Sequence, residues 1–133
     1  MSGRTARWAL LAPVVGAALV AAGVLGSLLG AALGVWDTPW IGALCAATVV
    51  SVSCAVAPAR RRLVASVALL MGAALAWRLL RPPSFYPESY GELAYQPTYV
   101  PILATYAAGL AAWLVCVLRA GRVDDAAAAT SQG

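Results

Sequence analysis

The chain contains no histidine, no lysine and no asparagine, and its three cysteines lie far apart. Without histidine there is no imidazole ligand for haem, no His-containing zinc site and no Ser–His or Cys–His catalytic pair. The cysteines form no C-x-x-C motif, and each lies in an apolar stretch, where cysteine usually packs as a small hydrophobic residue. We therefore predict a protein that is not an enzyme and that uses neither a metal nor a cofactor.

Charge is also scarce. Of the 133 residues, 62% are apolar and 11% are charged, whereas a soluble domain carries about 45–50% apolar and about 25% charged residues. A chain of this length has too little interior to hide so much apolar surface from water. The composition predicts an integral membrane protein whose first partner is the lipid bilayer.

Four long apolar stretches follow one another along the chain. A membrane helix needs roughly 20 apolar residues to cross about 30 Å of hydrocarbon, and these stretches predict spans over residues 11–35, 40–57, 63–80 and 99–118. Residues 81–98 form an outer loop, and residues 120–133, which lack an amphipathic period, are expected to be a disordered tail. The first stretch begins like a signal peptide but exceeds the about 7–15 apolar residues of one, so we expect it to be retained.

The arginines indicate the orientation, because positive charge marks the cytoplasmic side of membrane proteins. The side with both termini and the 58–62 turn has seven arginines and two aspartates, a net charge of +5, and the other side has −1. The sequence thus predicts an all-α integral membrane protein, a bundle of four transmembrane helices with both termini cytoplasmic. Since the arginines lie at membrane flanks, the basic balance does not indicate a nucleic-acid partner.

Small residues recur every four positions along the first span. Such a stripe lets another helix approach closely, which is how membrane helices associate. It faces either a sibling helix or a second copy of the chain. Its members are Ala18, Ala22, Gly26, Gly30 and Gly34.

The outer loop is rich in tyrosine, with Tyr86, Tyr90 and Tyr95 as its candidate interface residues. Pro87 suits the first position of a short helix that runs to about Tyr95, with Glu88 in its first turn. Tyrosine at this density is typical of the membrane–water interface and also of protein interfaces. The loop is therefore either a lid lying on the membrane or a docking surface for a partner.

Arg78 and Arg81 lie three residues apart near the end of the third span. They are candidates for a contact with an anionic lipid head group or another phosphate. The alternative is an interfacial anchor, in which the two side chains reach outward to water and pair with Glu88 or Glu92.

Polar side chains are rare at membrane depth, where they usually mark transport pathways. This scarcity favours an accessory, assembly or scaffolding protein that acts through its helix faces and the tyrosine-rich loop. The partner would be another membrane protein or a second copy. The alternative is a small oligomeric transporter or channel. Abundant alanine and glycine, with arginine in place of lysine, resemble the composition of proteins from high-G+C bacteria, so we expect the bacterial plasma (inner) membrane. No motif indicates a named family.

Overall fold

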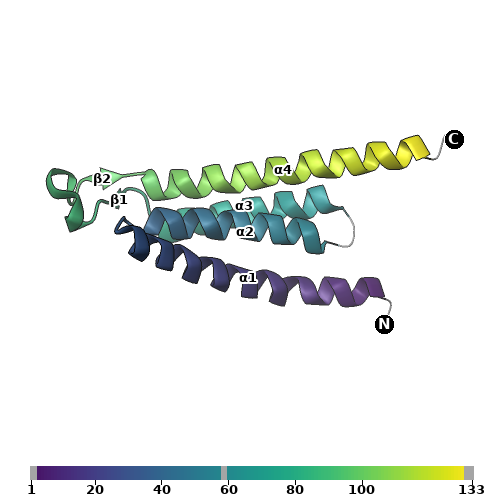
Figure 1. Ribbon diagram of the computed structural model, residues 1–133, viewed down its shortest axis with the longest axis horizontal. Coiled ribbons are helices and arrows are strands. Elements are labelled where there is room, and N and C mark those ends of the chain that lie inside the picture. Colours follow the sequence, from purple (N-terminus) through teal and green to yellow (C-terminus); the bar gives the residue numbers. More distant parts are fainter. Residues whose placement is uncertain (1–2, 58–59, 131–133) are drawn as a thin grey trace.

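The computed structural model describes residues 3–57 and 60–130 and is mostly helical. Its long helices are α1 (Gly3–Leu33), α2 (Thr38–Val56), α3 (Arg61–Leu80) and α4 (Val100–Thr130). The α3–α4 connection holds the short strands β1 (Ser84–Phe85) and β2 (Pro97–Thr98) and the 3₁₀ segment η1 (Glu88–Leu93). Both chain ends lie at one end of the molecule and the β1–η1–β2 loop lies at the other (Figure 1).

All four helices contain a segment long and apolar enough to cross a membrane, as the sequence predicted. These segments are Trp8–Leu33, Thr38–Val56, Arg61–Leu80 and Val100–Val123. Most of their large apolar side chains are exposed in the isolated chain. That pattern suits lipid as the solvent, since apolar side chains gain nothing by leaving hydrocarbon.

Helix α2 is the centre of the fold, because it packs against α1, α3 and α4. Helices α3 and α4 also pack on each other, whereas α1 packs mainly on α2 and diverges from it toward the N-terminus (Figure 1). The buried core joins Val50 of α2, Ala65 of α3 and Cys116 of α4. The arrangement is thus a three-helix unit with α1 on its edge.

Side-chain hydrogen bonds tie α4 to α3. The Tyr106 hydroxyl donates to the carbonyl of Ala73 at 3.1 Å, and the Trp113 indole donates to Ser66 Oγ at 2.9 Å. Ser66 in turn donates to the carbonyl of Arg62, one turn earlier in α3. Polar bonds of this kind hold membrane helices together where apolar contacts cannot distinguish a helix from lipid.

Helix α4 continues to Thr130, through most of the segment for which we expected disorder. The physical reason lies in helix cooperativity. The long apolar segment of α4 already supplies the nucleus, so each further residue only has to propagate the helix. Alanine, which fills residues 126–129, has the highest helix propensity. Residues 131–133 of the predicted tail lie outside the described part of the chain.

Candidate functional site

Three aromatic rings from two separate connections meet at the loop end. Trp36, in the α1–α2 turn, lies 5.6 Å from Tyr86 and 6.3 Å from Tyr90, measured between ring centroids. Tyr86 and Tyr90 lie 5.4 Å apart. The rings are tilted or edge-to-face, which are the favourable geometries for aromatic pairs. We call Trp36, Tyr86 and Tyr90 the aromatic cluster; it fastens the outer loop to the first two helices.

The loop is a small hairpin closed by its backbone. Strands β1 and β2 pair antiparallel, with Ser84 opposite Thr98. Beyond them Tyr86 N–H donates to the carbonyl of Gln96, and Tyr95 N–H donates to the carbonyl of Tyr86. The predicted helix over 87–95 is instead a 3₁₀ segment interrupted at Gly91, whose φ of 57° and ψ of −117° are not helical. Glycine adopts this conformation without steric cost, so Gly91 turns the chain there.

The rim of the loop exposes further aromatic and apolar side chains. Tyr95 is 68% exposed, and its ring makes no aromatic contact with the cluster among the described residues. Phe85 and Tyr99 are 59% and 53% exposed. Of the three tyrosines predicted from the sequence, two therefore join the cluster and Tyr95 stands outside it. Trp36 was missed, although its turn lies on the same predicted side as the loop.

Arg78 and Arg81 lie at the end of α3, and both side chains are exposed. Arg81 follows the last helical residue in the left-handed conformation, with φ of 33°, and its N–H donates to the carbonyl of Trp77. Within the part of the chain that the structure describes, no ion pair joins either arginine to Glu88 or Glu92.

The small-residue stripe of α1 divides into three parts. Ala22, Gly26 and Gly30 are buried, and Ala18 is half-buried. A Cβ atom at Gly26 would lie 2.7 Å from the Cα of Ile41, and one at Gly30 would lie 2.7 Å from the Cα of Asp37. Gly34 is exposed and ends α1 with a φ of 63°, while Val35 N–H bonds to the carbonyl of Gly30. This is the Schellman pattern, in which glycine stops a helix.

A disulfide joins Cys54 of α2 to Cys116 of α4, whose Cα atoms lie 6.4 Å apart. Our interpretation of these two residues as plain packing cysteines was therefore wrong; Cys45 alone remains a free thiol. The sequence held one indication of this pairing. Each of the two cysteines lies close to the arginine-rich end of its predicted span, so both are expected at a similar depth in the membrane. Among the described residues, no three His, Cys, Asp or Glu side chains gather closely enough to hold a metal ion.

Comparison with known proteins finds no matching family model, no similar curated protein and no similar solved structure.

Proposed function

We propose that this chain is a non-enzymatic integral protein of the bacterial plasma membrane, with both termini in the cytoplasm. It serves as an accessory, assembly or scaffolding component, and it binds another membrane protein through the outer loop. The observation that carries this proposal is the aromatic cluster of Trp36, Tyr86 and Tyr90. The cluster fixes the loop in place, so that the exposed ring of Tyr95 is presented from a preorganised hairpin.

Preorganisation favours a docking surface over a lid. A partner that binds a fixed loop loses less conformational entropy than one that must order a mobile segment. Rigid aromatic side chains are also enriched where protein interfaces gain most of their binding energy. The exposed aromatic and apolar side chains at the rim, Phe85, Tyr95 and Tyr99, match that composition.

Site-specific photocrosslinking tests the proposal. p-Benzoylphenylalanine replaces Tyr95 in cells, and the matched control replaces Leu70 on α3, since the two side chains are 68% and 70% exposed. We expect position 95 to form one discrete adduct with a different membrane protein and position 70 to react with lipid. Trp36→Ala should lower the yield of the adduct from position 95 because the loop loses its aromatic contacts with the α1–α2 turn.

Two other crosslinking outcomes would contradict this proposal. If position 95 reacts only with lipid, as position 70 does, the loop is a lid on the membrane and the proposal fails. If position 95 reacts with a second copy of the chain, and vesicles containing the purified protein conduct ions, the protein is the small oligomeric transporter or channel instead.

A further inference from the structure

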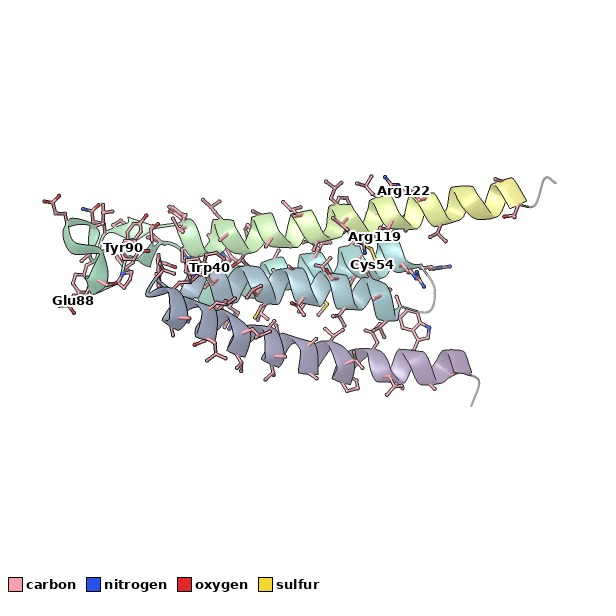
Figure 2. All side chains as sticks on the ribbon, viewed as in Figure 1. Trp40, Cys54, Glu88, Tyr90, Arg119 and Arg122 are labelled. Atoms are coloured by element: carbon pink, nitrogen blue, oxygen red, sulfur yellow. A yellow bond between two sulfur atoms is a disulfide. The ribbon has the colours of Figure 1, made fainter. Side chains whose placement is uncertain are left out.

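The end of the molecule opposite the aromatic cluster carries a group of exposed arginines from two elements. Arg60 and Arg61 stand at the start of α3, and Arg119 and Arg122 lie near the end of the apolar part of α4. Residues three apart on a helix share a face, so Arg119 and Arg122 point to neighbouring positions. Figure 2 shows these two side chains at the same end as Cys54, far from Glu88 and Tyr90.

A contact between α3 and α4 lies next to both pairs of arginines in the chain. The Arg62 guanidinium lies against α4 at Gly121, where a Cβ atom would come within 3.3 Å of its Nη2. Gly121 stands between Arg119 and Arg122, so the start of α3 meets α4 at this point. The Cys54–Cys116 disulfide clamps α2 to α4 just inside, and Arg119 follows Cys116 by three residues, about 4.5 Å along the helix.

The charges at the arginine-rich end of the molecule favour the binding of an anion. Segments 60–62 and 119–125 hold five arginines and two aspartates, a net charge of +3. Like charges held close together repel unless an anion lies between them. Guanidinium groups bind phosphate oxygens with two parallel hydrogen bonds, a geometry that ammonium groups cannot reproduce.

The surface just below the arginines is apolar. On α4, Leu118 lies one turn before Arg122 and is 58% exposed, and Val115 lies one turn before Arg119 and is 48% exposed. On α3, Leu63 is 55% exposed. A ligand for this end should therefore combine a phosphate with hydrocarbon, which is the make-up of a phospholipid and not of a free phosphate ion.

We propose that Arg60, Arg61, Arg119 and Arg122 form a binding site for the phosphate of an anionic phospholipid. The acyl chains of that lipid lie along the exposed apolar residues of α3 and α4. The site is at the other end of the molecule from the aromatic cluster, so it holds whether or not the loop binds a partner.

Native mass spectrometry of the delipidated protein tests this site. The probe is an equimolar mixture of dioleoyl phosphatidylglycerol and dioleoyl phosphatidylcholine, and the readout is the ratio of the two lipids retained. An arginine near an anionic lipid surface contributes roughly a fivefold preference. R119Q/R122Q should therefore lower the phosphatidylglycerol preference about 25-fold, and R60Q/R61Q should lower it similarly.

Net charge needs its own control. Adding E88Q/E92Q to R119Q/R122Q restores the net charge of the chain to +4, the wild-type value, while the arginine patch stays depleted. The preference should remain lost in this variant. Recovery of the preference would show that overall charge, rather than this site, selects the lipid, and the proposal would fail.

Two further results would overturn the proposal. One is a wild-type protein that retains both lipids equally. The other is a loss of the preference in R78Q/R81Q while R119Q/R122Q keeps it, which would place the lipid site at the end that carries the aromatic cluster. Adding millimolar inorganic phosphate distinguishes a site for the phosphate of a lipid from a site for a free phosphate ion. It should leave the bound phosphatidylglycerol in place, and complete displacement would mean that the site binds a free anion.

Discussion

Replacing Gly26 with alanine perturbs a close backbone contact between α1 and α2. A Cβ atom there would lie 2.7 Å from the Cα of Ile41 and 3.0 Å from its backbone nitrogen, and backbone cannot swing aside as a side chain can. To reach an ordinary contact of 3.4 Å, the two helices must separate by roughly 0.7 Å. Overpacking of this kind costs about 1–3 kcal/mol.

Gly16 provides the matched control on the same helix, since nothing lies within 4 Å of a Cβ atom built there. Both substitutions gain the same helix propensity, about 1 kcal/mol, so the difference between them isolates the contact. We expect Gly26→Ala to have a free energy of unfolding about 1–3 kcal/mol below that of Gly16→Ala, measured by SDS titration in mixed micelles. Equal stabilities for the two variants would refute the close approach of α1 to α2.

Three further predictions concern other contacts. Gly42→Ala places a methyl group against Thr105 Oγ1 and should lower the Tm in detergent. Adding Thr105→Ala should restore much of the lost Tm, and a double variant no more stable than Gly42→Ala would contradict this packing. Thiol titration of the denatured, unreduced chain should find one thiol, that of Cys45, and three after reduction; three before reduction would mean that the disulfide does not form. Replacing Arg78 and Arg81 with lysine should leave the yield from membranes unchanged, because either cation reaches water from a helix end, whereas a loss as large as that caused by glutamine would indicate a paired guanidinium site.

The four long apolar helices could be predicted because a bilayer, the solvent that the composition indicates, imposes a simple rule. Backbone groups in hydrocarbon must be satisfied within a helix, so length and the positions of charges suffice to locate each segment. The connections between the first three predicted spans are only a few residues long, which also predicts that consecutive spans are antiparallel neighbours. The place of α4 could not be predicted in this way. It depends on matched side chains, such as Gly42 against Thr105 and Gly109 against Leu69.

The candidate site was only partly accessible to sequence reasoning. Tyrosine density marked the loop, but the role of Trp36 depends on contacts across 50 residues or more of chain. The hairpin was missed because its strands are two residues long, too short for an alternating pattern to emerge. The short helix predicted from Pro87 to about Tyr95 is broken at Gly91, where φ is positive.

The disulfide was the feature hardest to predict from the sequence. Its cysteines are 62 residues apart, and their pairing follows only once α2 and α4 are known to be neighbours. The arginine-rich end is moreover predicted to be cytoplasmic, and disulfides are rare in that compartment. The arginine distribution and the disulfide thus favour opposite sides of the membrane for this end of the molecule.

Cysteine labelling in intact cells decides between them and tests the membrane architecture directly. In a background with Cys45→Ala, a single new cysteine is introduced as Ser89→Cys in the outer loop or Ser131→Cys near the C-terminus, and a membrane-impermeant maleimide is added. We predict that position 89 reacts in intact cells and that position 131 reacts only after permeabilisation. Reaction of both positions from outside would contradict a membrane-spanning α4, and reaction of position 131 alone would reverse the orientation.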